Sequence, residues 1–205
     1  NLMVKPVIRP EFVQNKLDRN CLENLLEIIR MAKKDSKRLI VGGGWIVDAY
    51  LGQRIRNHTD IDMYVPYEEV NYWQKYFLGR HFVANKHEGI NKDERYYKSF
   101  AFQVPKEQKY LWVDVVGIGV ERGQMFDMEE GKKEFWDMSE KEAIFEREIQ
   151  GEKVECLSPK FKIKSILECK RVMTVIEPGK DYAKYDLDLE ILGNKASARE
   201  GILFN

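Results

Sequence analysis

Hydrophobic residues recur at helical spacing in the first part of the chain. Between residues 11 and 34, after Pro10, the apolar positions fall mostly on one stripe, with Lys, Asp, Glu and Arg opposite. The stripe contains Phe12, Leu17, Cys21, Leu22, Leu25, Leu26, Ile28 and Ile29. This pattern predicts an amphipathic helix over residues 11–34.

The central part of the chain shows the alternation of β-strands. Every second residue between positions 60 and 65 is apolar, which predicts a strand with one buried face that Pro66 ends. Further strands are predicted at 39–41, 80–85, 95–104 and 110–116, with a hairpin of 143–149 and 153–157 around Gly151. Short helices are predicted at 45–51, where Gly52 ends the helix, and at 68–78.

The last part of the chain has helical signals. Ser158 followed by Pro159 predicts a helix start, and that helix extends to about Ile176. A last helix is predicted over 180–192, between the breakers Pro178-Gly179 and Gly193-Asn194. This order predicts an α+β fold, with a mixed sheet flanked by helices in residues 1–157 and a helical segment packed against it in residues 158–205. Residues 117–142 match no pattern that we can assign.

Composition and charge exclude several classes of protein. With 205 residues, 43% of them hydrophobic and 33% charged, the chain is globular rather than disordered. Its 34 Lys plus Arg balance 34 Asp plus Glu, which argues against bulk nucleic-acid binding as the main activity but leaves a local basic pocket open. The three cysteines have no zinc spacing, and no membrane span or signal-peptide core is evident. We therefore expect a cytoplasmic protein without a membrane partner.

Three aspartates in predicted strands are candidate metal ligands. Asp60 and Asp62 point from one face of their strand, roughly 7 Å apart along it, where like charges disfavour each other. Asp114 is the single charge in an apolar run, and a carboxylate there is costly to bury unless it is paired or bound to a metal. A hard cation such as Mg²⁺ would relieve both problems. Taken singly, the pair also fits a solvated sheet edge, and Asp114 also fits a cap at a strand end.

A glycine run precedes the first of these strands. Gly42, Gly43 and Gly44 lie between a predicted strand and a helix that begins at Trp45. Such a turn lets backbone amides approach a phosphate, although by itself it fits equally a tight turn without a ligand. Together with the aspartates, it suggests a site for a metal-bound nucleoside triphosphate.

The stretch from Leu39 to Pro66 resembles the N-terminal signature of antibiotic nucleotidyltransferases. The nearest resemblance is to the aminoglycoside 2''-adenylyltransferases and lincosamide nucleotidyltransferases of the DNA polymerase β-like superfamily. The matching positions are Gly42, Gly43, Gly44, Trp45, Asp48, Leu51, Gly52, Arg56, His58, Asp60, Ile61 and Asp62. Asp114 matches the third superfamily carboxylate, and the tail with Lys180, Asp181, Asp186 and Leu189 resembles the ending of lincosamide-type enzymes.

The resemblance implies a fold, an activity and cofactors. The fold is a polymerase β-like mixed sheet, and the activity is transfer of a nucleoside monophosphate to a hydroxyl of a small molecule, such as an aminoglycoside or a lincosamide. The donor would be ATP or another nucleoside triphosphate, with two Mg²⁺ ions that stabilise the attacking and leaving oxygens. Asp60 and Asp62 would hold both ions, and Asp114 would be a metal ligand or the general base. Gly43 and Gly44 would offer amides to the triphosphate, and Gly42 belongs to the same nucleotide-binding turn.

Several other residues are candidates for nucleotide binding. Arg56 either contacts phosphate or forms an ion pair, and His58 either has a positioning role or bonds within its loop. We interpret Asp48 as a structural residue that could orient them, and Trp45 as a core residue. A basic helix face could reach the β- and γ-phosphates or simply be solvated; it comprises Lys160, Lys164, Lys170 and Arg171. Lys180 is a similar candidate, with a salt bridge as its alternative.

Two other functions stay open at this point. The chain could be a toxin–antitoxin type nucleotidyltransferase that modifies protein or transfer RNA, or a nucleotide-binding module without catalysis. Retention of all three carboxylates argues against the second. Acidic residues outnumber basic ones between Glu121 and Glu148, which would suit a cationic acceptor but fits a solvated surface equally well.

Overall fold

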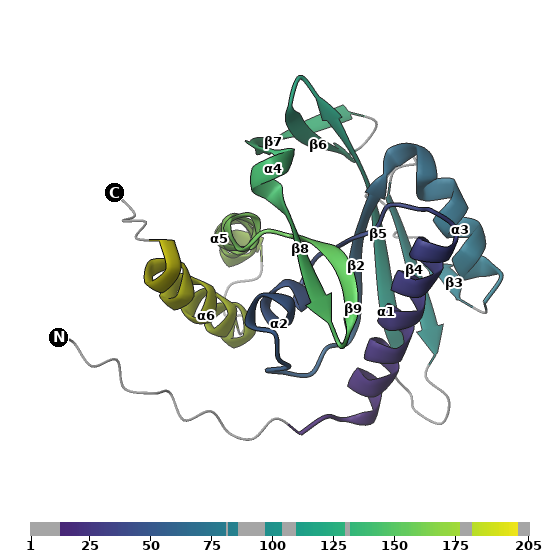
Figure 1. The fold of residues 1–205 in the computed structure, drawn as a ribbon, viewed down its shortest axis with the longest axis horizontal. Coiled ribbons are helices and arrows are strands. Elements are labelled where there is room, and N and C mark those ends of the chain that lie inside the picture. Colours follow the sequence, from purple (N-terminus) through teal and green to yellow (C-terminus); the bar gives the residue numbers. More distant parts are fainter. Residues whose placement is uncertain are drawn as a thin grey trace.

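The computed structural model describes residues 13–80, 82–85, 97–103, 110–129, 132–176 and 182–200. Within these residues nine strands form one sheet, in the order β3-β4-β5-β2-β1-β9-β8, and β6 and β7 extend from β5 (Figure 1). The strands are β1 (Ile40–Val41), β2 (Asp60–Pro66), β3 (Val83–Asn85), β4 (Tyr97–Gln103), β5 (Tyr110–Glu121), β6 (Gln124–Glu129), β7 (Lys132–Ser139), β8 (Ile144–Ile149) and β9 (Glu152–Leu157). The helices are α1 (Lys16–Lys34), α2 (Trp45–Leu51), α3 (Val70–Leu78), α4 (Glu140–Ala143), α5 (Pro159–Ile176) and α6 (Ala183–Glu200).

The sheet is mixed, and its alternation separates an apolar face from an acidic one. β2 runs parallel to β5, and β1 runs parallel to β9, while the other pairs are antiparallel. Because side chains alternate along a strand, Ile61 and Val113 point to one face, and Asp62 and Asp114 point to the other. The α+β fold class predicted from the sequence is confirmed.

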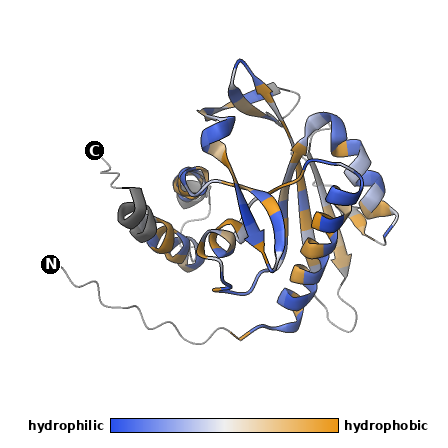
Figure 2. Ribbon diagram, in the orientation of Figure 1, coloured by the Kyte–Doolittle hydropathy of each residue, from blue (hydrophilic) through white to orange (hydrophobic). Residues whose placement is uncertain are grey.

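Helices α1 and α3 cover the apolar face (Figure 1). Leu25 and Ile29 of α1 and Trp73 and Phe77 of α3 are almost fully buried there. Figure 2 shows hydrophobic and hydrophilic residues along the whole of α1, as a helix with one buried face requires. These two helices pack against β2 and β5 on the apolar face, so the acidic face is left for the functional site.

Helices α2, α5 and α6 lie on the other side of the sheet (Figure 1). Val47 of α2 packs with Ile191 and Leu192 of α6, so the C-terminal helices contact the segment that follows the glycine turn. No helix in the described part of the chain is both long enough and apolar enough to cross a membrane.

The structure corrects several predicted boundaries. The first helix begins at Lys16 rather than residue 11, because the Asn15 side chain accepts a hydrogen bond from the Asp18 amide and caps it. β5 continues to Glu121, and the unassigned residues 117–142 contain its second half and the β6–β7 pair. The last helix passes Gly193 and continues to Glu200, so that predicted end is wrong. The hairpin around Gly151 and the helix start at Pro159 are confirmed.

Candidate active site

Three aspartates lie on neighbouring strands of the acidic face. Asp62 on β2 is the direct partner of Asp114 on the parallel strand β5, and Asp60 lies two residues before Asp62 on the same side. Ser99 of β4 is the partner of Asp114 on its other side, and its hydroxyl donates to Asp114 Oδ1. The fold therefore brings the three predicted carboxylates together, although β5 is about fifty residues from β2 in the sequence.

The acids of this cluster act on one another. Burial raises the pKa of Asp62 most, the charges of Asp60 and Asp114 raise it further, and together they bring it to about 7. Two cations oppose the shift, Lys162 of α5 and Lys184 of α6. The site thus concentrates negative charge that a bound cation would stabilise.

The glycine turn lies directly against Asp62. The Gly42 amide donates to the Asp62 carbonyl at 2.8 Å, so this amide pairs with β2 and is not available to a phosphate. Gly43 has φ +59°, and a Cβ at this position would overlap Asp62 Oδ2. Only glycine gives the turn both the left-handed backbone and the close approach to the carboxylate.

The donor set fits a hard cation by its chemistry. Among the described residues, no three His, Cys, Asp or Glu side chains are close enough to form a ready-made metal site. Carboxylate oxygens are nevertheless the ligands that Mg²⁺ takes, and it usually completes its shell with substrate phosphate and water. Asp60, Asp62 and Asp114 are the residues that would hold such ions, and the raised pKa of Asp62 shows the unbalanced charge that the ions would neutralise.

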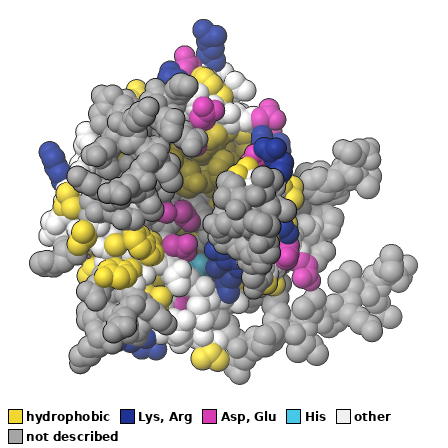
Figure 3. All heavy atoms as spheres, turned by 180° about the vertical axis from the view of Figure 1, so that it is seen from behind, with side chains coloured by type: hydrophobic (Ala, Val, Ile, Leu, Met, Phe, Trp, Pro, Cys, Tyr) yellow, Lys and Arg dark blue, Asp and Glu magenta, His cyan; other side chains and the backbone are white. Residues whose placement is uncertain are grey.

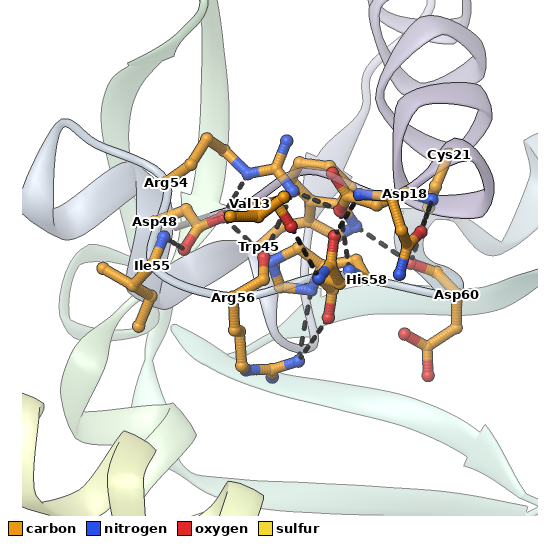
Figure 4. Close-up of polar contacts among 12 residues, drawn as sticks. Val13, Asp18, Cys21, Trp45, Asp48, Arg54, Ile55, Arg56, His58 and Asp60 are labelled. Atoms are coloured by element: carbon orange, nitrogen blue, oxygen red, sulfur yellow. Dashed lines mark hydrogen bonds and ion pairs between the residues drawn. The ribbon is translucent and has the colours of Figure 1, made fainter. Parts of the chain in front are cut away.

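His58 is 1% exposed and lies among the polar contacts that precede the metal strand (Figure 4). Its Nε2 is 2.9 Å from Asp48 Oδ2, its ring stacks on Trp45, and its backbone amide donates to Asp18 Oδ1. The histidine predicted as a nucleotide-binding residue is therefore enclosed by protein. Its geometry supports a positioning role for the strand that begins two residues later.

Arg54 completes a buried network that the sequence interpretation missed. Its Nε donates to Asp48 at 2.7 Å, and its Nη2 donates to Asp18 on α1. The network also holds the backbone of Asp60, whose carbonyl accepts from Trp45 Nε1 at 2.9 Å. Figure 4 shows the Asp60 side chain pointing away from these partners. One signal was visible in the sequence, since Asp18 lies next to the apolar stripe, where an acid needs a partner.

The predicted basic face of α5 points away from the carboxylates. Lys164 is exposed, and its ammonium is 3.6 Å from Asp137. The other residues of this face pair locally, Lys160 with Glu142, Lys170 with Asp186 and Arg171 with Glu168. Lys180 lies outside the described residues. The structure therefore does not bring Lys164 to the acids.

Lys162 of α5, which the sequence analysis did not select, lies on the side of the helix toward the acids. It is 8% exposed, and burial lowers its pKa, while the charges of Asp188 and Asp62 raise it. Lys162 is four residues before Ile166, which is buried, so both lie on the inner face of α5. This spacing was the available signal, because a lysine at a core position needs an anionic partner or ligand.

Arg56 pairs with an acid from the other end of the chain. Asp188 of α6 is fully buried and accepts from Arg56 Nε at 3.3 Å and from Nη2 at 3.2 Å. Of the two interpretations of Arg56, the structure shows the ion pair, and a contact with phosphate stays a prediction.

Aromatic side chains form one wall beside the acids. Tyr64, two residues after Asp62, contacts Trp136 and Phe161 with ring centroids 5.9 and 6.2 Å away. Trp136 donates to Asp127 Oδ2 at 3.1 Å. From behind, the surface shows acidic side chains between a hydrophobic area and a group of Lys and Arg (Figure 3). The face thus combines charge for a metal and phosphates with apolar surface.

Comparisons with known proteins agree with this geometry. The profile of the aminoglycoside-2''-adenylyltransferase family matches residues 24–165. The fold is similar to the lincomycin-bound lincosamide antibiotic adenylyltransferase LnuA, with a TM-score of 0.58 at 17% identity over 83% of this chain and 95% of that chain. It is also similar to ANT(2'')-Ia in complex with adenylyl-2''-tobramycin, with a TM-score of 0.59 at 20% identity over 87% and 93%. No curated protein sequence matches the chain significantly.

Proposed function

Because the chain belongs to the aminoglycoside-2''-adenylyltransferase family and is a nucleotidyltransferase, we propose that it transfers AMP from ATP to a hydroxyl of an aminoglycoside or lincosamide. The observation that carries the proposal is the pairing of Asp62 with Asp114 on parallel strands, with the Gly43 turn against Asp62. The solved relatives named above bind lincomycin or an adenylylated tobramycin, which supports a small antibiotic as the acceptor. Because the proposed donor is ATP, we also propose that the enzyme acts in the cytoplasm.

In the proposed reaction, the acceptor hydroxyl attacks the α-phosphorus in line and pyrophosphate leaves. Mg²⁺ ions held by Asp60, Asp62 and Asp114 would supply charge stabilisation for the attacking and leaving oxygens. Asp114 would act on the attacking hydroxyl, either as a metal ligand or as the general base. The Ser99 hydroxyl, which donates to Asp114 Oδ1, would hold this carboxylate in place. Lys162 would bind the leaving phosphates in place of Lys164, because it is buried on the inner face of α5, where the charge of Asp62 acts on its ammonium.

The first experiment measures whether the nucleotide and the metal bind together. We expect ATP with Mg²⁺ to raise the melting temperature more than either one alone, because the phosphates of ATP complete the ligand shell of the metal. Differential scanning fluorimetry with ATP, CTP, GTP and UTP, each with and without Mg²⁺, measures this effect. An equal response with and without the metal would contradict the proposed site.

The acceptor is identified by the mass of the product. Incubation with ATP, Mg²⁺ and a panel of aminoglycosides and lincosamides should add the mass of one adenylyl group to a member of the panel. A panel left unmodified by a protein that does bind Mg²⁺ and ATP would contradict the antibiotic acceptor.

Lys162 offers a test of the phosphate contact. We expect Lys162→Met to weaken ATP binding by about 10- to 100-fold, which corresponds to loss of a charge-assisted hydrogen bond. Lys164→Met is the matched control, since it removes the same charge from an exposed position two residues away, and it should leave ATP affinity unchanged. Equal affinities for the two variants, measured by titration calorimetry, would contradict the assignment.

A further inference from the structure

Asp188 joins the C-terminal helix to the loop in front of the metal strand. Its carboxylate is fully buried, and it accepts both hydrogen bonds from Arg56, 132 positions earlier in the sequence. Burying such a pair costs desolvation energy that can exceed its attraction, so the pair is weak evidence for stabilisation alone. A role in the site would account for an acid in this position.

The Arg56 guanidinium that Asp188 holds lies against the glycine turn. A Cβ at Gly44 would overlap Arg56 Nη2 and would come 2.9 Å from His58 Nδ1. Arg56 Nη1 is also 3.3 Å from His58 Nδ1. The guanidinium therefore lies in close contact with Gly44 of the turn.

Lys162 of α5 is a second cation on which Asp188 acts, and its side chain is buried. Asp188 is the acid that acts most strongly on its charge, followed by Asp62. Among the described residues, no hydrogen bond or ion pair engages the Lys162 ammonium, which has three donors. Asp188 thus acts on two cations, Arg56 through hydrogen bonds and Lys162 through its charge.

We propose that Asp188 is a positioning residue of the triphosphate site, where it fixes Arg56 against the glycine turn and directs the Lys162 ammonium toward the phosphates of the bound nucleotide. The proposal rests on the nucleotidyl transfer proposed above. It makes α6 part of the nucleotide site, although Asp188 itself touches no nucleotide. A phosphate of the triphosphate would accept hydrogen bonds from the Lys162 ammonium.

A double-mutant cycle tests whether Asp188 acts through Lys162. The four proteins are the wild type, Asp188→Asn, Lys162→Met and the double variant, each titrated with ATP by calorimetry and assayed for KM and kcat. We expect Asp188→Asn to weaken ATP binding about 10-fold, as the loss of a supporting contact does, with kcat changed by less than about threefold. The double variant should lose less ATP affinity than the sum of the two single losses, because part of the effect of Asp188 passes through Lys162. Additive losses in the double variant would overturn the proposal.

Asp186→Asn is the matched control on the same helix. Asp186 is exposed and pairs with Lys170 of α5. This variant therefore removes an acid from α6 and breaks a contact between α5 and α6, at a position that does not face the three site aspartates. Its ATP affinity should equal that of the wild type. A loss equal to that of Asp188→Asn would mean that helix packing is the cause and would overturn the proposal.

The remaining outcomes are also decisive. If Asp188→Asn does not fold by circular dichroism, Asp188→Glu takes its place in the cycle, because it keeps the buried charge and moves it by one methylene. Coupling with Lys162→Met then supports the proposal, and additivity overturns it. If the wild type binds ATP and Lys162→Met weakens binding while the Asp188 variant does not, only this proposal fails. If the wild type binds no ATP, the proposed function fails with it.

Discussion

Asp62→Asn is expected to reduce kcat by more than about 1,000-fold while the protein stays folded. Asp62 lies beside Asp114 and against the Gly43 turn, so it joins the carboxylate cluster to the glycine turn. Asparagine keeps the shape of the side chain but loses the charge that a divalent ion requires. Single-turnover transfer of labelled AMP measures the loss.

The same variant should be more stable than the wild type without metal. The pKa of Asp62 is raised from 3.8 to about 7, so the folded state holds a proton that the unfolded chain releases between these values. The stability of the wild type therefore falls as pH rises through this window, and the cost of the charge is complete above about pH 7. Melting temperatures should be higher for Asp62→Asn at pH 8 and should converge with those of the wild type toward pH 4. A stable and fully active Asp62→Asn protein would remove the basis of the metal site.

The second large effect is expected at Gly43. An alanine there would place its Cβ on Asp62 Oδ2, and the residue would also have to adopt φ +59°. The overlap must move the carboxylate or the turn, and a displacement of about 1 Å at a reacting centre can cost roughly 100-fold in rate. The left-handed backbone should cost a further 1–2 kcal/mol or so of stability. Transfer rates and urea unfolding measure the two effects separately.

Gly52→Ala is the control for backbone strain. Gly52 has φ +70°, but nothing lies within 4 Å of the Cβ it would gain. Both alanine variants should therefore lose stability, whereas only Gly43→Ala should lose activity. Equal activity in the two variants would show that the contact of the turn with Asp62 has no role in transfer.

Local patterns in the sequence were sufficient to predict most of the helices and strands and part of the site. Alternation with period two predicted that Asp60 and Asp62 share a face, and it holds for any strand in any sheet. The Ser158-Pro159 pair predicted the start of α5 correctly, since capping is decided by the adjacent residues. Gly52 was predicted to end the short helix α2, and it does so in a left-handed conformation.

Predictions failed where one residue's role depends on distant parts of the chain. The basic stripe of α5 was correct as a pattern, but the rotation of the helix is set by packing of Ile166, which places Lys162 inward and Lys164 outward. β6 and β7 were missed because their pairing depends on the second half of β5 more than on their own composition. For His58 the sequence left a positioning role and bonds within its loop open, and the structure shows its ring buried between Trp45 and Asp48.

The sequence by itself determined most of the strands, the side of the strand from which Asp60 and Asp62 project, and the glycine turn, because these follow from backbone geometry within a few residues. Only the tertiary structure decided that Asp114 would become the neighbour of Asp62, that Lys162 would face the acids, and that Asp188 would hold Arg56. Those contacts join residues that lie 52 to 132 positions apart, and their formation depends on how whole helices and strands pack, which no local pattern encodes.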